Sequence, residues 1–316
     1  MRAVLSWPDA IDAIRDAYRT PVDAAALPPR TMARTDGAWL RSLSGLTADT
    51  GHMGVKLIAA SPANRRASYL VALFDRRTTA LVALLDGNHI TGMRTAATSA
   101  VAVEALAPQA PLRVAVVGSG FEAANHVAAL AGVREIAGLA VFSPTEANRR
   151  RFAAEVAAAH GVPADAADSA EEAVRDADLV IAAARSRDET PTVHGAWLRP
   201  DATVVSIGST LPEQRELDVE ALRRAGTIVA DMPDEVLTQT GDMLAAAAEG
   251  AELAGKVVPL TDLLGGAWTR PEDSVAIWKS VGSALQDLTV SELCVRRARE
   301  RGVGRSLGET IGAVAK

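Results

Sequence analysis

The 316-residue sequence lacks the markers of several protein classes. Its single cysteine, Cys294, excludes an internal disulfide and is typical of a protein in the reducing cytoplasm. No stretch approaches the roughly 18 consecutive apolar residues of a membrane helix. The apolar core of the N-terminal segment is too short for a signal peptide. We therefore expect a soluble, cytoplasmic protein without a membrane segment.

Charge and aromatic content argue against two kinds of binding. The net charge is −6, whereas proteins that bind nucleic acid usually present a basic face, so no nucleic-acid partner is expected. We interpret the basic segment 296–305 as a solvated helix face, with a subunit contact as the second interpretation. Aromatic residues make up only 3% of the chain, which disfavours a large hydrophobic ligand pocket.

Metal-binding patterns are lacking as well. The histidines are scattered, without metal-ligand spacing and without a cysteine partner, so the sequence predicts no metal site. They are His52, His89, His126, His160 and His194.

The first third of the chain indicates an α+β arrangement. An amphipathic helix is expected near the N-terminus, with Ile11, Ile14 and Tyr18 on one side. Apolar stretches separated by Gly, Asp, Asn and Pro then favour largely antiparallel strands, followed by a turn at Asp86-Gly87. A helix is expected from about residue 91 to 107. The predicted strands are AWLRSLSGL, GHMGVKLIAASP, YLVALFD and TTALVALLDGNHI.

From Leu112 onward, strands and helices alternate, which predicts a parallel, doubly wound sheet. The strands are LRVAVVGSG, IAGLAVFS, ADLVIAAA, ATVVSIG and GTIVAD. From about Asp273 we expect a long helical ending. The predicted fold class is α/β, with a Rossmann dinucleotide-binding domain at 111–285. A second α/β domain would combine 1–110 with 286–316.

A glycine pattern after the first of these strands marks a dinucleotide site. Gly118, Gly120 and Ala123 follow a buried strand and open a helix. Gly118 permits the tight turn, Gly120 lets the backbone approach a pyrophosphate, and Ala123 lets helix and strand pack closely. The helix N-terminus adds amide donors and positive potential. An ordinary strand–helix turn is the alternative, but a series of βα units favours the dinucleotide.

The end of the next strand bears on the choice of cofactor. NAD sites usually hold the ribose with an acid about 20 residues beyond the glycines, but Ser143 stands there. Thr145 follows, and Arg149, Arg150 and Arg151 lie on the next helix. A hydroxyl with a cation suits a 2′-phosphate, so NADP(H) is favoured and NAD(H) is the alternative. Two of the three arginines are expected only to solvate the helix.

Six blocks of sequence occur in one order along nearly the whole chain: GVKLIAASPANR, LLDGNHITGMRTAATSA, VAVVGSGFEA, SIGSTLPEQRELD, DMPDEVLTQTGDM and WKSVGSALQDL. They resemble the ornithine cyclodeaminase/mu-crystallin family. The resemblance implies a Rossmann domain joined to a substrate-binding, dimerising α/β domain built from both chain ends, and hence a homodimer. It also implies a nicotinamide cofactor and a small substrate, either a cyclic imine or an α-amino or α-keto acid.

The resemblance implies that three cations hold the substrate carboxylate: Arg30, Lys56 and Arg94. A bidentate arginine with a lysine charge can orient a carboxylate so that the adjacent carbon faces the nicotinamide. Arg94 lies among small apolar residues of a helix and Lys56 lies within an apolar strand. An unpaired cation would be costly in either place, which favours a ligand role for both. Arg30 lies in a proline-rich loop, where a surface position is the alternative.

Further contacts carry over by position from the same blocks. Phe121 and Glu122 follow the glycines, and Ser206 and Ile207 end a later strand. All four are expected to contact the cofactor, with simple packing as the alternative.

The WKSVG block supplies two more residues. Ser280 is expected near the cofactor and Val281 near the substrate, again with packing as the alternative.

Thr210 bears on the reaction. In the family's cyclodeaminases and alanine dehydrogenases an aspartate occupies this position, whereas mu-crystallin-like ketimine reductases carry a serine. Deamination needs a base near the reacting nitrogen, and a threonine hydroxyl can only hydrogen bond near neutral pH. Reduction of a preformed imine needs a hydride and an oriented substrate. Glu213 and Asp86 are alternative acids, in which case Thr210 only caps its loop.

The sequence therefore favours NAD(P)H-dependent reduction of a small cyclic imine carboxylate of the pyrroline-2-carboxylate or piperideine-2-carboxylate type. Lys56, Arg94 and Thr210 are the candidate catalytic residues. An ornithine or lysine cyclodeaminase, or an oxidoreductase resembling alanine dehydrogenase, is the alternative. An NADPH-dependent protein that binds a small ligand is the alternative from another class.

Overall fold

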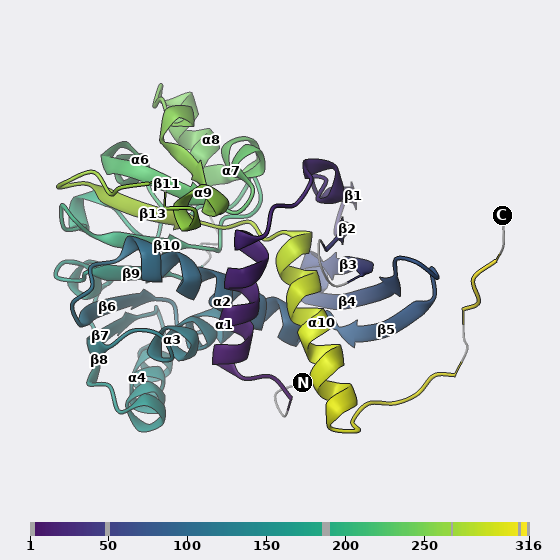
Figure 1. Cartoon of the computed structure of the whole chain (residues 1–316). Helices are drawn as coiled ribbons and strands as arrows, with labels where there is room; N and C mark the ends of the chain where they lie inside the picture. The colour runs from purple at the N-terminus through teal and green to yellow at the C-terminus, as the bar shows by residue number, and fades with distance from the viewer. Residues whose placement is uncertain (1–3, 48–50, 185–189, 267, 309–310, 315–316) are drawn as a thin grey trace. The chain divides into compact units, whose positions relative to one another are not determined.

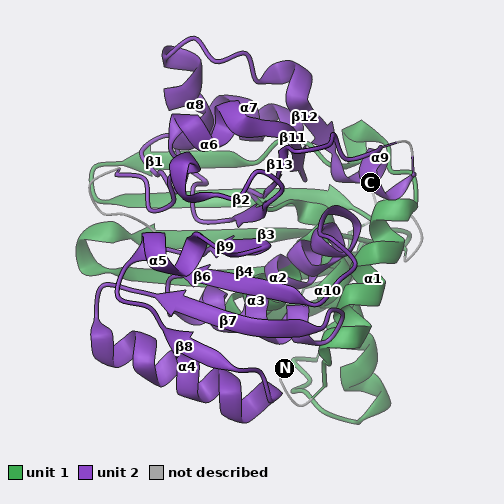
Figure 2. Cartoon of the chain, turned by 90° about the vertical axis from the view of Figure 1, so that its left-hand side faces the viewer, with its two compact units in different colours: residues 1–94, 282–316 green, residues 95–281 purple. Residues whose placement is uncertain are grey.

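The computed structural model describes residues 4–47, 51–184, 190–266, 268–308 and 311–314. The chain forms two compact units (Figure 2). The first unit combines residues 1–94 with 282–316, and the second comprises residues 95–281. No helix in the described ranges is long and apolar enough to cross a lipid bilayer.

The first unit contains a five-stranded antiparallel sheet in which consecutive strands pair (Figure 1). Hairpin connections suffice for this order because each strand lies beside the next one in sequence. The strands are β1 (Thr31–Thr35), β2 (Ala38–Leu46), β3 (His52–Ser61), β4 (Arg66–Asp75) and β5 (Leu81–Asp86), with short 3-10 helices at Ala24–Ala26 and Pro62–Asn64.

Two helices from opposite ends of the sequence lie side by side in this unit, α1 (Trp7–Arg19) and α10 (Ala284–Glu300) (Figure 1). Ser6 caps α1 by accepting a hydrogen bond from the Asp9 amide. The same aspartate pairs with Arg297 of α10 at 2.9 Å. Ile11, Ile14 and Tyr18 are buried, as the amphipathic pattern predicted.

Helix α10 covers one face of the sheet. A Cβ atom built on Gly54 of β3 would lie 2.7 Å from Leu288 Cδ2, so Gly54 faces this helix. Successive side chains of a strand point to opposite faces. Lys56 therefore shares the face covered by α10, and Val55 and Leu57 lie on the other face.

The second unit contains an eight-stranded, fully parallel sheet in the order β12-β11-β13-β10-β9-β6-β7-β8. Its apolar, β-branched strands are typical of a sheet buried on both faces. The strands are β6 (Leu112–Val117), β7 (Ile136–Phe142), β8 (Ala164–Ala166), β9 (Leu179–Ala182), β10 (Thr203–Ser206), β11 (Ala225–Ala230), β12 (Val257–Pro259) and β13 (Val275–Lys279).

The strand order reverses beside β6, since β7 and β8 lie on one side and β9 and β10 on the other. Such a reversal is where open α/β sheets bind their ligands. Helix α2 (Gly87–Leu106) begins in the first unit and ends in the second. The other helices of the second unit are α3 (Phe121–Ala131), α4 (Glu146–His160), α5 (Ala170–Val174), α6 (Val219–Arg224), α7 (Pro233–Gln239), α8 (Gly241–Ala248) and α9 (Leu260–Leu264), with 3-10 helices at Gly195–Trp197 and Ala254–Lys256.

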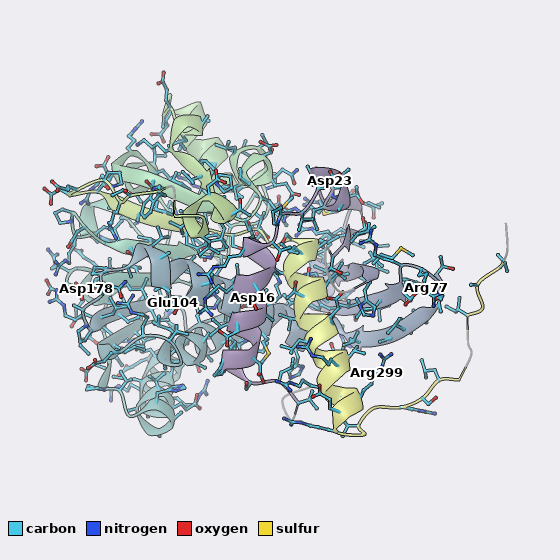
Figure 3. The ribbon with its side chains drawn as sticks, in the orientation of Figure 1. Asp16, Asp23, Arg77, Glu104, Asp178 and Arg299 are labelled. Atoms are coloured by element: carbon cyan, nitrogen blue, oxygen red, sulfur yellow. The ribbon has the colours of Figure 1, made fainter. Side chains whose placement is uncertain are left out.

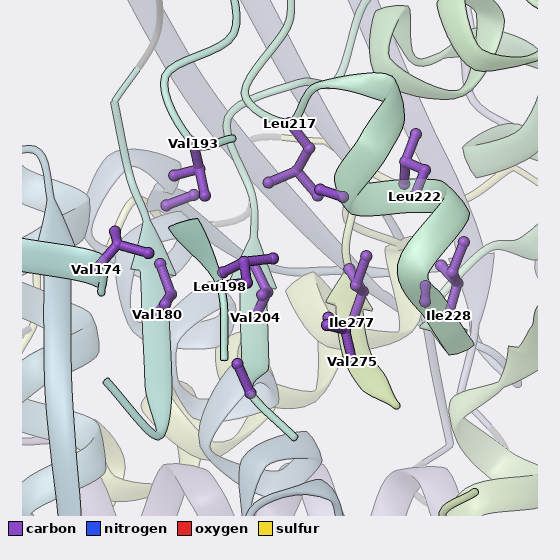
Figure 4. Close-up of a cluster of buried hydrophobic side chains, with 14 of the residues drawn as sticks. Val174, Val180, Val193, Leu198, Val204, Leu217, Leu222, Ile228, Val275 and Ile277 are labelled. Carbon is purple, nitrogen blue, oxygen red and sulfur yellow. The ribbon is translucent and has the colours of Figure 1, made fainter. Parts of the chain in front are cut away.

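The core of this unit is aliphatic (Figure 4). Val180, Val204 and Ile277 come from neighbouring strands, and Leu217 and Leu222 pack over them from the segment around α6. All five are fully buried. Burial of this apolar surface is the main stabilising contribution to the sheet.

The two edges of the parallel sheet differ in their polar contacts. Asp178 precedes β9 at the amino edge (Figure 3) and forms partly exposed ion pairs with Arg113 and Arg199, at 3.3 and 3.4 Å. Pairs of this kind contribute little to stability. The carboxyl edge instead carries buried polar groups, which are described below.

A buried hydrogen-bond chain connects β13, α2 and α3. Trp278 Nε1 donates to Ser99 Oγ at 3.0 Å, and Ser99 Oγ lies 3.0 Å from His126 Nε2. His126 Nδ1 lies 2.7 Å from the Glu122 carbonyl oxygen. Because a carbonyl only accepts, Nδ1 of His126 carries a hydrogen, and in this tautomer of the neutral ring Nε2 accepts from the Ser99 hydroxyl.

The predicted α/β class with a parallel Rossmann-type sheet is confirmed. The expectation of a helical ending from Asp273 is wrong for its first part, because Val275–Lys279 form strand β13 between β10 and β11. Helix α2 begins at Gly87, where a turn was expected. The compact units divide after residue 94, within α2, and after residue 281, shortly after β13. The sequence suggested domain boundaries after 110 and 285.

Replacing Ser99 with Ala should destabilise the second unit. Trp278 Nε1 would lose its acceptor and His126 Nε2 its donor in a buried place, so we expect the free energy of unfolding to fall by about 1–3 kcal/mol. Urea denaturation measures this change. Ser44→Ala, at an exposed position of β2, should leave the free energy of unfolding almost unchanged. An equal loss of stability in both variants would contradict the stabilising role of the Trp278–Ser99–His126 hydrogen bonds.

Candidate active site

The first unit contains a buried cluster of opposite charges. Lys56 on β3 places Nζ 2.7 Å from Oδ1 and 2.6 Å from Oδ2 of Asp287 on α10. Both side chains are inaccessible to solvent, with exposed fractions of 1% and 0%. Burying a lysine is costly unless an opposite charge accompanies it, and Asp287 meets this requirement.

Arg94 on α2 binds the same carboxylate. Its Nε donates to Asp287 Oδ1 at 3.0 Å, and its Nη1 donates to Gln286 Oε1 at 2.7 Å. Gln286 Nε2 in turn donates to the Tyr18 hydroxyl at 2.8 Å. A Cβ atom on Gly282 would lie 2.6 Å from Arg94 Nη1, so a glycine is required beside the guanidinium.

The cluster changes the protonation of Lys56. The pKa of Lys56 is lowered to about 8, mainly by burial and also by the charge of Arg94, while Asp287 opposes the change. A lysine with this pKa is largely protonated at neutral pH and loses its charge in mildly alkaline solution. Lys56 and Arg94 together therefore carry more positive charge at neutral pH than the single carboxylate of Asp287 balances.

The structure brings two of the three predicted cations together. Lys56 and Arg94 share Asp287, while Arg30 is partly buried in the segment that precedes β1. The place of Arg30 in a carboxylate clamp stays a prediction. Sequence reasoning missed Asp287 and Gln286, although both lie in the WKSVGSALQDL block and are polar residues in a buried helix start.

The predicted glycine turn has the shape that a dinucleotide requires. Gly118 follows β6 with φ of 117°, and a Cβ atom there would lie 2.6 Å from the Ala183 carbonyl oxygen. Gly120 is the N-cap of α3, and a Cβ atom there would meet nothing within 4 Å. Ala123 is fully buried against the sheet. The backbone at Gly120 is thus open to a phosphate in front of the helix N-terminus.

Three further residues predicted to contact the cofactor lie at the starts of α3 and α4. Phe121 is 42% exposed, and Glu122 is partly buried in the first turn of α3. Thr145 is the N-cap of α4, and its side chain makes no capping hydrogen bond.

Ser143 and Arg149 lie together at the end of β7. Ser119 Oγ donates to Ser143 Oγ at 2.9 Å, and Arg149 Nη1 donates to the Ser143 carbonyl at 3.3 Å. Arg149 is buried, lies over the Phe142 ring at 5.7 Å, and pairs with the exposed Asp168 at 3.4 Å.

The other two arginines of α4 form exposed pairs. Arg150 pairs with Glu146 and Arg151 with Glu155. The interpretation that two of the three arginines solvate the helix face is therefore confirmed.

Two predicted cofactor contacts at the carboxyl edge have their hydroxyls engaged within the protein. Ser206 Oγ donates to Glu216 at 2.9 Å. Ser280 Oγ donates to Asp231 Oδ2 at 2.6 Å, and the amide of Val281 donates to Asp231 Oδ1 at 3.1 Å.

The remaining predicted residues are Ile207 and Thr210 in the loop after β10, and Val281 after β13. Ile207 and Val281 are buried. The Thr210 amide and hydroxyl both donate to Gln214 Oε1, at 3.1 and 3.3 Å. The loop therefore holds Thr210 by its own side-chain contacts.

Among the described residues, no group of three or more His, Cys, Asp or Glu side chains is arranged so that it could hold a metal ion. His194 pairs with Asp218 at 3.0 Å and His52 with Glu292 at 3.3 Å. His89, the histidine nearest in sequence to Arg94, is 41% exposed and lies 4.0 Å from Asp86.

The parallel sheet with its glycine turn defines a Rossmann-type dinucleotide-binding protein that carries a second α/β unit. The chain belongs to the ornithine cyclodeaminase/mu-crystallin family, whose profile matches residues 4–302. It is 29% identical over 263 residues to a Delta(1)-pyrroline-2-carboxylate reductase of Bacillus cereus, covering 81% of this chain and 80% of that protein. It is 30% identical over 223 residues to the ketimine reductase mu-crystallin of Mus musculus, covering 71% and 67%.

Solved structures resemble the whole chain. Delta(1)-pyrroline-2-carboxylate reductase of Thermococcus litoralis, in complex with NADH and L-proline, superposes with a TM-score of 0.89 at 26% identity, covering 97% of each chain. A probable ornithine cyclodeaminase of Bordetella pertussis Tohama I superposes with a TM-score of 0.84 at 30% identity, covering 96% of this chain and 97% of that one.

Replacing Asp287 with Asn should destabilise the first unit, because the variant keeps the size of the side chain and removes the anion shared by Lys56 and Arg94. Breaking a buried pair in this way costs about 3–5 kcal/mol. Urea denaturation at pH 7 measures the loss. Asp12→Asn removes the carboxylate of an exposed pair on α1 and should cost at most about 1 kcal/mol; similar losses in both variants would contradict the account of the cluster.

Proposed function

We propose that this protein reduces a small cyclic imine carboxylate, of the pyrroline-2-carboxylate or piperideine-2-carboxylate type, to the cyclic amino acid. The observation that carries the proposal is the buried pair of cations, Lys56 and Arg94, that share one carboxylate. The chain also carries a Rossmann glycine turn, and its relatives include reductases of pyrroline-2-carboxylate and of ketimines.

The residues of the first unit supply substrate binding. Lys56 and Arg94 carry two positive charges against the single negative charge of Asp287, so the group attracts one carboxylate of a substrate. Fixing the carboxylate also fixes the adjacent imine carbon, which lowers the entropic cost of reaction.

The residues of the second unit supply cofactor binding. The amides at Gly120 and the N-terminus of α3 would hold the pyrophosphate of a nicotinamide dinucleotide. When bound in reduced form, this cofactor supplies the hydride that the imine carbon accepts. The nitrogen of the product carries a proton that the iminium form of the substrate brings with it.

Thr210 favours reduction over deamination. Its hydroxyl is neither an acid nor a base near neutral pH, and cyclodeamination requires proton transfer at the amine. Of the alternative acids, Asp86 is 62% exposed at the end of β5 and accepts the Asn88 amide, as an ordinary surface carboxylate does.

The proposal predicts oxidation of NADPH with pyrroline-2-carboxylate or piperideine-2-carboxylate, followed at the reduced-nicotinamide absorbance. It predicts no release of ammonia from ornithine, which the same preparation would show if it were a cyclodeaminase. Lys56→Met should lower kcat/KM by about 100-fold or more, because a charged contact to the substrate is lost. Robust formation of proline from ornithine would contradict the proposal.

We also propose that NADP(H) is preferred. Support comes from Ser143, which stands in place of an acid, and from Arg149, which is buried directly beside it. A guanidinium matches a phosphate in charge and hydrogen-bond geometry.

Arg149→Ala should therefore raise the KM for NADPH by about tenfold or more and change the KM for NADH by much less. Arg150→Ala, which removes an exposed arginine one residue away, is the matched control and should change neither constant. A wild-type enzyme that clearly prefers NADH would refute this assignment.

We further propose a homodimer formed through the sheet face opposite α10. The exposed apolar side chains Leu40, Leu70 and Leu84 lie there with Val55 and Leu57, by the alternation of the paired strands. A contiguous apolar face is typical of a protein interface, and one patch can serve both subunits about a twofold axis. A second copy of the chain is the partner that we propose.

Leu70→Glu combined with Leu84→Glu should convert the dimer to a monomer, because both chains would bring buried charges to the same interface. Light scattering coupled to size exclusion gives the mass directly. Leu244→Glu, at an exposed leucine of α8, should leave the dimer intact. A wild-type monomer at micromolar concentration would rule the interface out.

A further inference from the structure

A buried polar network surrounds the start of the loop that follows β10. Its four side chains, Ser206, Glu216, Asp242 and Lys279, come from separate segments of the second unit and are each 0% exposed. Lys279 Nζ lies 2.6 Å from Asp242 Oδ2 and donates to Ser206 Oγ at 3.1 Å. Ser206 Oγ donates in turn to Glu216 Oε2 at 2.9 Å.

The backbone of the loop binds the same two carboxylates. The Gly208 amide donates to Glu216 Oε2 at 2.8 Å. The amides of Glu216 and Leu217 donate to Asp242 Oδ1 at 2.8 and 3.2 Å. Glu216 thus joins the beginning of the loop to its end, and Asp242 holds that end.

Two glycines fit closely against this arrangement. A Cβ atom on Gly208 would lie 2.3 Å from Glu216 Oε1. A Cβ atom on Gly241 would lie 2.3 Å from the Gln214 carbonyl oxygen and 2.5 Å from that of Pro212. A side chain at either position would displace the loop or the carboxylate.

We propose that Glu216 is a positioning residue for imine reduction, because its hydrogen bonds to Ser206 and Gly208 fix the loop that carries Thr210. The kinetic part of this inference rests on the proposed function; the structural part does not. Glu216 is fully buried and acts through the loop rather than on the substrate. Lys279 and Asp242 hold the network from the neighbouring strand and helix.

Hydrogen bonding, rather than charge, is the contribution of Glu216. The pKa of Glu216 is raised to about 7, mainly by burial and also by Asp242, while Lys279 and the hydrogen bonds from Gly208 and Ser206 oppose the increase. Lys279 keeps Asp242 as its ion-pair partner whether or not Glu216 is ionised. A glutamine at position 216 retains an acceptor oxygen for both donors, and a leucine retains none.

Hydrogen exchange of the full-length protein tests the structural part without any substrate. We expect the peptide that spans residues 206–217 to exchange about tenfold faster or more in Glu216→Leu than in the wild type. Glu216→Gln, and the control Glu220→Gln at an exposed position of α6, should match the wild type. If the leucine variant does not fold, Ser206→Ala should show the same acceleration to a smaller degree. Unchanged exchange in the variants that remove contacts would overturn the inference.

Steady-state kinetics with pyrroline-2-carboxylate and NADPH test the functional part. In Glu216→Leu, kcat should fall about tenfold or more while the KM for NADPH stays within about threefold. Glu216→Gln should restore at least about half of the wild-type kcat, a rescue that general destabilisation would not give. Equal losses of kcat in both variants would contradict the inference. A wild-type protein that reduces no imine would refute the proposed function and leave the exchange result to decide the positioning of the loop.

Discussion

The carboxylate of Asp287 lies within hydrogen-bonding distance of both Lys56 and Arg94 in a place that water does not reach. Burying the two cations without it would be costly, because breaking a buried pair leaves an uncompensated charge and destabilises a protein by about 3–5 kcal/mol. One anion against two cations leaves a net positive charge, and the proposed function assigns that charge to binding the substrate carboxylate.

The two units contribute in different ways to the proposed reaction. In the first unit, the two cations are held between elements that pack on one another. Lys56 lies on β3 beneath α10, and Arg94 lies on α2 beside Gly282. The second unit gathers its polar groups at the carboxyl edge of a parallel sheet, where strands of this kind bind ligands. There, Glu216 and Asp231 engage the hydroxyls of Ser206 and Ser280. Buried acids thus hold the hydroxyls of these two serines in place.

Local sequence was sufficient for features that depend on a few consecutive residues. The tight turn at Gly118, with its positive φ, follows from a glycine between a strand and a helix. The separation of Arg149 from the two solvated arginines follows from the helical period, which turns one side of α4 toward the sheet. The alternating βα pattern likewise predicted the parallel sheet.

Contacts between distant segments were beyond sequence reasoning. Lys56 and Asp287 are separated by 231 positions, and Lys279 and Asp242 by 37, so no local pattern indicates which acid meets which lysine. Strand β13 was mistaken for helix because its five residues run directly into the motif before α10. Its apolar run fits a buried strand and a buried helix equally well.

The most direct test of the cation cluster is the proton uptake that accompanies binding of pyrrole-2-carboxylate to the protein saturated with NADP+. Titration calorimetry in buffers of different ionisation enthalpy measures it. In the protein without ligand, Lys56 has a pKa of about 8, so it is mostly neutral at pH 9 and mostly charged at pH 7. A bound carboxylate raises the pKa of Lys56. We predict uptake that approaches one proton at pH 9, almost none at pH 7, and none at either pH in Lys56→Arg. Binding at pH 9 without proton uptake, or with the same uptake in Lys56→Arg, would contradict the account.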